Sequence, residues 1–381
     1  MEPFKNVFSP ELVGVIADHL QRRLPTFHRH NFEGRILASL ADLELKDRAQ
    51  LIADHIHQAL PEDNKRRGDI LLSMLHADEN VRNTVQSGDD GVCGWGIQPL
   101  VTVVGQHGLG DFDRSLFLLK EMTKRFTSEF GIRYFLLADQ DRVLATLTGW
   151  VDDKNHHVRR LVSEGTRPRL PWAMQLPNLI ADPSPMLPIL EALRDDNEDY
   201  VRRSVANHLN DIAKDHPDLV AGLANQWMKN GDSNRQKLVR HACRSLIKSG
   251  HRDALKAFGL SAPKIQSPSL VIDTPTVVFG QMLSFHAAIQ SSSDKAQPLV
   301  VDYVVHFRKA KGELAGKVFK WTKFNLGPGE TRELTRNHSI KPITTRKYYP
   351  GGQALSLRIN GEDFGDAAFE LLMPGIENTK V

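Results

Sequence analysis

The segment HHVRRLVSEGTRPRLPW, residues 156–172, decides the fold because its first half recurs as YVRRSVANHLND, residues 200–211. With Val158, Val201 and Val239 in register, three copies read HVRRLVSEG, YVRRSVANH and LVRHACRSL, with separations of 43 and 38 residues. These periods are typical of two-helix repeats of the HEAT or armadillo kind, which stack side by side. The sequence therefore predicts an α-helical repeat array.

The composition of the chain changes sharply near residue 262. Before that point, apolar residues recur at helical spacing in blocks such as 36–51 and 115–126. After it, β-branched residues alternate with polar ones in LVIDTPTVVFG, LSFHAAIQ and LVVDYVVHFRK, and turn signals such as GPGE and PGGQ separate these runs. We therefore predict an all-α HEAT-like repeat domain over 1–260, a linker over 261–269, and an all-β, antiparallel immunoglobulin-like sandwich over 270–375.

Bulk properties exclude several classes of protein. A net charge of +3 on 381 residues is small, so contact with a polyanion requires a local basic patch. The two cysteines, Cys93 and Cys243, lie far apart, which predicts a reducing compartment with neither a disulfide nor a zinc site. Signal-peptide and membrane-span patterns are absent, so we expect a cytoplasmic protein that contacts no membrane. No nucleotide-binding motif or metal-ligand spacing occurs, and neither a cofactor nor a metal is expected.

Repeat register places two sets of residues in rows across neighbouring helices. One residue after each aligned position, including the looser copy FGIRYFLLAD, stand Arg133, Arg159, Arg202 and Arg240. Six residues after it stand Ala138, Glu164, Asn207 and Ser245. Further arginines lie nearby at Arg160, Arg167, Arg169 and Arg203. Arginine rows suit a DNA phosphate backbone, although arginines in such helices also serve for packing or for acid pairing between repeats.

Two longer blocks carry a family resemblance. LKEMTKRFTSEFGIRYFL (119–136) and NHHVRRLVSEGTRPRLPW (155–172) resemble the signature of the AlkC family of bacterial 3-methyladenine DNA glycosylases. That family is related to the AlkD-like glycosylases, whose HEAT-like repeats form a DNA-binding cleft. The resemblance covers essentially all of the helical portion, and some members carry a C-terminal immunoglobulin-like domain.

The resemblance implies a DNA glycosylase of base excision repair. Its substrates would be small cationic alkylated bases, namely 3-methyladenine and by extension 3-methylcytosine or 1-methyladenine, removed without an enclosed pocket for a flipped nucleotide. We expect alkylated double-stranded DNA as the partner, a monomer without an obligate protein partner, and no lyase activity, because no lysine is placed for Schiff-base chemistry. The alternative is a non-enzymatic HEAT-repeat scaffold that binds nucleic acid or protein, because a fold does not by itself imply a function.

Three acids are candidates for the chemistry, because a fixed carboxylate stabilises the cationic sugar that forms as the base leaves. Glu164 occupies the ladder position beside the arginines and is expected to be catalytic. Glu121 lies on the polar side of the amphipathic segment DRSLFLLKEMTKRF, at a motif position that resembles the helix lining AlkD-like clefts, and is expected to be catalytic as well. Glu129 follows Thr127 and Ser128, where helix capping predicts a structural role.

Several other residues are expected to contact DNA. Trp172 ends the RPRLPW motif and would stack on a sugar or base, or else anchor the loop by packing. His156 would touch phosphate or cap its helix, because adjacent histidines diverge on a helix and do not form a zinc pair. Asn207 matches the position of a later aromatic cleft residue in the AlkD-like group, so lesion contacts should differ from that group. His208 is a weaker candidate of the same kind.

The β-rich part carries a basic and aromatic stretch of its own. HFRKAKGELAGKVFKWTKF, residues 306–324, interleaves lysine and arginine with phenylalanine and tryptophan around a predicted hairpin turn. Such a pattern suits a DNA backbone and predicts contacts from Lys320 and Lys323. Lysines that face outward from a strand also protect an exposed sheet edge, which is the plain structural alternative.

Overall fold

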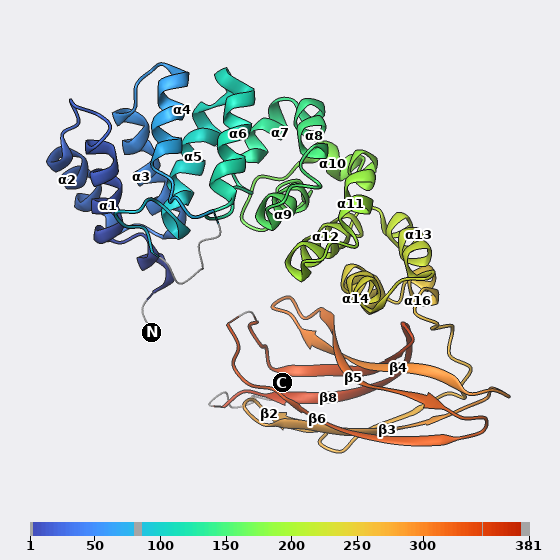
Figure 1. Ribbon diagram of the computed structural model, residues 1–381. Coiled ribbons are helices and arrows are strands. Elements are labelled where there is room, and N and C mark those ends of the chain that lie inside the picture. The colour runs from blue at the N-terminus through green and yellow to red at the C-terminus, as the bar shows by residue number, and fades with distance from the viewer. Residues whose placement is uncertain (1–2, 80–85, 345, 375–381) are drawn as a thin grey trace. The chain divides into compact units, whose positions relative to one another are not determined.

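The computed structural model describes residues 3–79, 86–344 and 346–374 (Figure 1). The chain divides into two compact units, of which the first comprises Met1–Asp215 with Ser233–Ala242. The second comprises His216–Asp232 with Cys243–Val381.

The first unit is built of α-helices that pack on neighbours further along the chain. Helix α3 packs on α5, α5 on α7, α4 on α6, α9 on α12 and α12 on α14, as stacked two-helix repeats require. The bounds are α1 (Pro10–Gln21), α2 (Arg29–Leu40), α3 (Leu45–Ala59), α4 (Asn64–Ser73), α5 (Ile97–His107), α6 (Phe112–Thr123), α7 (Ile132–Ala138), α8 (Gln140–Thr148), α9 (His156–Glu164), α10 (Pro177–Ala181), α11 (Leu187–Leu193), α12 (Asp199–Ile212) and α14 (Ser233–Ala242).

The repeat register read from the sequence agrees with this stacking. Val158, Val201 and Val239 lie on α9, α12 and α14, and each is at most 1% exposed. They bury the shared apolar face of three successive helices. The predicted α-helical repeat is therefore present.

The second unit combines short helices with two β-sheets. One sheet has the strand order β1-β3-β6 and the other β2-β8-β7-β4-β5. Neighbouring strands are antiparallel except that β2 runs parallel to β8, which departs from the purely antiparallel expectation. The bounds are α13 (Pro217–Met228), α15 (Arg244–Ser249), α16 (Arg252–Lys256), β1 (Ser269–Ile272), β2 (Thr276–Val278), β3 (Met282–Gln290), β4 (Gln297–Arg308), β5 (Leu314–Leu326), β6 (Thr331–Ser339), β7 (Gly351–Ile359) and β8 (Glu362–Leu372).

The interior of the sheets is aromatic and aliphatic. Phe285 of β3, Tyr303 of β4 and Trp321 of β5 pack ring against ring, and Leu355 of β7 is fully buried in the same cluster. Alternating side chains of the strands supply this core, as expected for a sandwich.

Both cysteines are buried and free, and burial raises the pKa of the Cys243 thiol to about 12. Within the described parts of the chain, every helix is too short or too polar to traverse a lipid bilayer.

Candidate functional site

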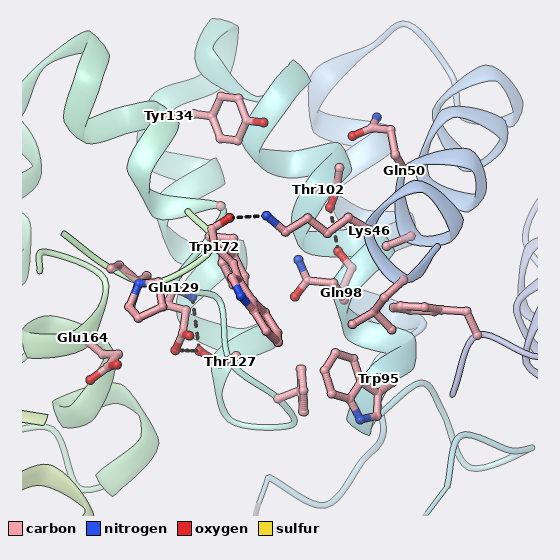
Figure 2. Close-up of a pocket in the computed structure, with 18 of the residues that line it drawn as sticks. Lys46, Gln50, Trp95, Gln98, Thr102, Thr127, Glu129, Tyr134, Glu164 and Trp172 are labelled. Atoms are coloured by element: carbon pink, nitrogen blue, oxygen red, sulfur yellow. Dashed lines mark hydrogen bonds between the residues drawn. The ribbon is translucent and has the colours of Figure 1, made fainter. Parts of the chain in front are cut away.

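A hollow of about 450 Å³ opens in the first unit where the segment 156–172 meets helices from earlier repeats (Figure 2). Its walls are largely aromatic and aliphatic, but two carboxylates, an arginine and a lysine also line it. The lining residues include Lys46, Trp95, Gln98, Phe126, Thr127, Glu129, Tyr134, Glu164, Arg167 and Trp172. An apolar hollow with a few convergent polar groups is the usual form of a binding or catalytic site.

Glu164 is the last residue of α9 and reaches this hollow with its side chain held on both oxygens. Its Oε1 accepts from Arg167 Nη1 at 2.7 Å and lies 3.4 Å from Arg160 Nη2. Its Oε2 accepts from the Ser204 hydroxyl at 2.7 Å. Burial by itself raises the pKa of Glu164, but the two arginines and Ser204 outweigh it and hold the pKa below its ordinary value. The carboxylate is therefore ionised at neutral pH.

Glu129 lies in the loop before α7 and lines the same hollow. Its Oε2 accepts from Arg160 Nη1 and from the Thr127 hydroxyl, each at 2.6 Å. Arg160 therefore bridges Glu129 and Glu164, which brings two acids 35 positions apart in sequence into one site. The sequence predicted a helix-capping role for Glu129, and the structure places its carboxylate on Arg160 at the hollow.

Glu121, the other acid expected to be catalytic, lies elsewhere. It stands on α6, where its carboxylate contacts Lys124 Nζ at 2.8 Å and Arg125 Nη1 at 3.3 Å. Lys124 and Arg125 follow Glu121 by three and four positions at the end of α6, which is the spacing at which helical side chains meet. Glu121 is not among the residues that line the hollow. Glu121 is therefore held in a largely buried ion-pair cluster outside the hollow, and the geometry favours Glu129 over Glu121 as the partner of Glu164.

A third carboxylate extends the network behind Glu164. Arg167 donates through Nε to Asp211 Oδ2 at 2.8 Å, as well as through Nη1 to Glu164. Asp211 is 2% exposed at the end of α12. Sequence reasoning did not assign it, although it ends the second copy of the repeat motif, where that copy carries an acid.

Arg133 is fully buried, so the structure contradicts its expected contact with DNA. Its guanidinium donates to the backbone carbonyls of Met174, Gly165 and Arg167 at 2.6–2.9 Å. Burial lowers its pKa to about 10, which still leaves it charged at neutral pH. Arg133 therefore organises the loop 165–174, which carries Arg167 and Trp172 to the hollow.

Trp172 occupies a backbone conformation that favours glycine. Ala173 N donates to Leu170 O at 3.3 Å, Pro171 lies between them, and Trp172 has φ 66°, which matches a type II turn. Lys46 of α3 donates to the Trp172 carbonyl at 2.6 Å (Figure 2). The indole is 69% exposed although it borders the hollow. A strained turn thus presents a large aromatic side chain to solvent, as strained residues at functional sites often do.

Three of the remaining predicted arginines, Arg159, Arg169 and Arg202, are paired with acids or backbone. Arg159 forms a two-pronged ion pair with Asp196 at 2.6 and 2.9 Å, and Arg202 is only 8% exposed and bonds the Asp196 carbonyl. Arg169 pairs with Asp215 at 2.8 Å but remains partly exposed. Arg203 is exposed, and Arg240 makes contacts within the protein. Acid pairing between repeats, one alternative weighed for these arginines, describes Arg159, whereas Arg202 bonds within its own repeat, as the packing alternative expects.

The other polar candidates on these helices differ in exposure. His156 and His157 are half-buried beside Tyr200, and Asn207 is half-buried on α12. His208 is 0% exposed, with Nδ1 2.9 Å from the Ser163 carbonyl. A DNA contact from His208 is therefore contradicted by its burial.

We expect His208 to make the protein less stable in mild acid. Burial lowers the pKa of His208 to about 4 in the folded protein. As the pH falls, this imidazole is therefore protonated near pH 6.5 in the unfolded chain but only near pH 4 in the folded chain. The corresponding stability is complete above pH 6.5 and is lost as the pH falls toward 4, by about 2 kcal/mol between pH 6.5 and 5. Urea unfolding at pH 7.5 and 5 measures this loss. His208→Gln, which does not titrate, should lessen it, and an unchanged pH dependence would contradict the assignment.

In the second unit, basic residues gather around a separate hollow of about 680 Å³. It is lined by Lys248, Arg308, Lys309, Lys311, Lys317, Arg346 and Lys347, with Glu313 as the one acid among its lining residues. Lys320 and Lys323 are exposed on β5, where Lys320 stands opposite Asp302. The basic side chains of the segment 306–324 are thus concentrated around the β4–β5 turn.

Comparison with known proteins gives consistent matches. The family model described as DNA alkylation repair enzyme matches residues 128–254, and that of the C-terminal Ig-like domain of YhaZ matches residues 266–373, which confirms the predicted immunoglobulin-like fold. The uncharacterized protein YhaZ of Bacillus subtilis (strain 168) is 38% identical over 366 residues, covering 95% of this chain and 97% of YhaZ. The structure of the Pseudomonas fluorescens alkylpurine DNA glycosylase AlkC, bound to DNA containing an abasic site analog, matches with a TM-score of 0.83 and 35% identity over 97% of this chain and 99% of AlkC.

Proposed function

The chain belongs to the family of YhaZ and AlkC-like proteins and carries a DNA alkylation repair enzyme domain, as its motifs predicted. On this basis we propose that it is an alkylpurine DNA glycosylase. The observation that carries the proposal is the pair of carboxylates, Glu129 and Glu164, that share Arg160 at one hollow. In a non-enzymatic scaffold the two acids would serve only to pair with arginines, and their replacement could not affect release of a base.

The proposed reaction is hydrolysis of the N-glycosidic bond of a small cationic base. An N3-methylated purine already carries a positive charge, so it leaves without protonation while positive charge develops on the deoxyribose. A carboxylate fixed beside the sugar stabilises that charge, and the same group orients the attacking water. Glycoside hydrolases use carboxylates against a related transition state, which is an analogy.

We assign the chemistry to Glu164, with Glu129 as the second acid. Glu164 is held on both oxygens and ionised, whereas Glu129 is held through Oε2 by Arg160 and Thr127. The principal substrate in this proposal is 3-methyladenine, and 3-methylcytosine and 1-methyladenine follow because they are equally small and cationic. The products are the free base and an abasic site, without strand cleavage by a lyase step.

We propose that Trp172 contacts the DNA at the protein surface. In that arrangement no base needs to enter an enclosed pocket. Its indole is exposed at the mouth of the hollow that holds both acids, which suits stacking on a sugar or base opened by the enzyme. Among the arginine candidates on the helical unit, Arg203 is exposed and Arg169 is partly exposed, and we propose that these two contact phosphate. In this proposal the protein acts as a cytoplasmic monomer on double-stranded DNA.

Substituting Trp172 should separate stability from activity. Because its φ of 66° suits glycine, Trp172→Gly should exceed Trp172→Ala in free energy of unfolding by about 1 kcal/mol. Both variants should release base about 10- to 100-fold more slowly, through loss of stacking worth about 1–3 kcal/mol. Urea unfolding and single-turnover excision measure the two effects. Equal stability of the variants, or full activity in either, would contradict this role.

The second unit is proposed to add DNA affinity through its basic hollow and the β5 lysines. Changing Lys309, Lys311 and Lys317 together to Gln should reduce the steepness of the salt dependence of binding by up to about 0.9 per lost phosphate contact. The double change at Lys320 and Lys323 tests the face predicted from sequence, and Lys295→Gln, an exposed lysine before β4, is the control. If neither set alters the slope, the sandwich contributes no phosphate contacts.

Release of a defined base tests the proposed function itself. Purified protein is incubated with duplex DNA treated with a methylating agent, and the liberated bases are separated and identified. We expect 3-methyladenine well above the spontaneous rate and no strand breaks beyond those of abasic sites. Binding to DNA without release of any alkylated base would instead favour the scaffold.

A further inference from the structure

Ser204 is a polar residue at a position that the repeat otherwise fills with apolar side chains. Three residues after the aligned position of each repeat stand Phe135, Leu161, Ser204 and Ala242. Each of these four residues is at most 2% exposed. A buried hydroxyl needs a partner, and a serine within a helix commonly bonds the carbonyl four residues earlier. Ser204 instead donates to Glu164 on the neighbouring helix, at 2.7 Å.

A second hydroxyl lies behind the first. Ser163 Oγ is 2.6 Å from Ser204 Oγ, and Ser163 is fully buried. An ionised carboxylate only accepts hydrogen bonds, so Ser204 gives its proton to Glu164. Ser163 Oγ also lies 3.2 Å from the Arg160 carbonyl, but the 2.6 Å contact between the two hydroxyls requires a proton between them, and only Ser163 can supply it. The order Ser163 to Ser204 to Glu164 is therefore fixed, and each bond in such a chain strengthens the next.

The carboxylate of Glu164 is consequently gripped from two directions. Arg167 and Arg160 face Oε1, whereas Ser204 holds Oε2. The terminal torsion of a glutamate is soft, so the arginines alone leave the plane of the carboxylate free to turn about Oε1. Ser204 removes that freedom, and its own position is set by α12 packing on α9.

We propose that Ser204, supported by Ser163, is a positioning residue that fixes the plane of the Glu164 carboxylate toward the deoxyribose. This inference rests on the proposed glycosylase function. Ser204 does not itself meet the substrate, since it is 2% exposed and is not among the residues that line the hollow. Its effect on the reaction must pass through Glu164, and that requirement separates a positioning role from ordinary packing.

A double-mutant cycle tests the requirement. Single-turnover release of 3-methyladenine is measured for the wild type, Ser204→Ala, Glu164→Gln and the double variant. Loss of one hydrogen bond to a charged group should slow Ser204→Ala about 10- to 100-fold, with affinity for abasic-site DNA unchanged. With Glu164 already replaced by Gln, the same serine change should alter the rate less than about 2-fold, because residues in one network are not additive.

Two further variants distinguish the chain of hydroxyls from general packing. Ser163→Ala keeps the direct donor to Glu164 and should slow the reaction only a few-fold. Ser115→Ala is the matched control, because Ser115 is 4% exposed on α6 and its hydroxyl bonds the Gly108 carbonyl at 2.8 Å, away from the hollow. It should leave the rate unchanged.

The outcomes separate the two claims. Equal rate losses from Ser204→Ala in both backgrounds, or no loss in either, would overturn the positioning role while leaving a glycosylase. A wild type that releases no alkylated base would overturn the proposed function. In that case the double-mutant cycle is measured by urea unfolding. Ser204→Ala should lower the unfolding midpoint clearly when Glu164 is present and much less after Glu164→Gln. Equal shifts in the two backgrounds would overturn the assigned coupling as well.

Discussion

Replacing Glu164 by Gln is expected to slow single-turnover base release by about 100- to 1,000-fold, as loss of one preorganised electrostatic group typically does. The substitution keeps the shape of the side chain but removes the charge that we propose stabilises the sugar. DNA affinity should change far less, because Glu164 is buried at the inner wall and repels rather than attracts phosphate. Rates at saturating enzyme and affinities for abasic-site DNA measure the two quantities separately.

Glu121→Gln is the matched control for this prediction. Glu121 carries the same charge on α6 but pairs with Lys124 and Arg125 outside the hollow. Its loss leaves two largely buried cations without that partner and should lower the free energy of unfolding, while excision by the folded protein should change less than about 3-fold. Glu129→Gln should slow excision, as Glu164→Gln does, because both acids share Arg160. A large effect at Glu121 with a small one at Glu129 would reverse the assignment made from the geometry.

Replacing Arg133 by Met is expected to be the most destabilising of these changes. The guanidinium is fully buried and supplies donors to three carbonyls of the loop 165–174, and each buried group left without a partner costs about 1–3 kcal/mol. We expect the free energy of unfolding to fall by about 3–5 kcal/mol in urea titrations, and base release to fall with it because the loop carries Arg167 and Trp172.

Arg159→Met is the control, because it changes the same repeat position one unit further along the chain. Arg159 is partly exposed, but its partner Asp196 is largely buried, so the loss should be about 1–3 kcal/mol, smaller than that expected at Arg133. If Arg133→Met were no more destabilising than Arg159→Met, the loop would not depend on this buried arginine.

Much of the fold follows from periodicity, which is local information. The recurrent valine and arginine pattern predicted stacked helices because equivalent residues of each copy bury the same face, as Val158, Val201 and Val239 do. The shift from helical to alternating spacing near residue 262 predicted the β-rich region for the same reason. Glu164 was recognisable as an acid among arginines within that register.

The rest of the site depended on how distant segments meet. Glu121 and Glu129 lie in one motif, and helical spacing could not tell which of them faces cations on its own helix and which faces a hollow. Arg133 and Arg159 share a repeat position, yet only Arg133 is covered by the loop 165–174, whose path no periodicity encodes.

The amino-acid sequence alone determined the repeated helices, the β-rich region and the family, because residue spacing and motifs along the chain identify each of them. Tertiary structure decided which acids act together and which polar groups hold them. Lys46 meets the Trp172 carbonyl across 126 positions, and Ser204 meets Glu164 across 40. Such contacts arise only when stacked helices bring residues far apart in the chain within hydrogen-bonding distance.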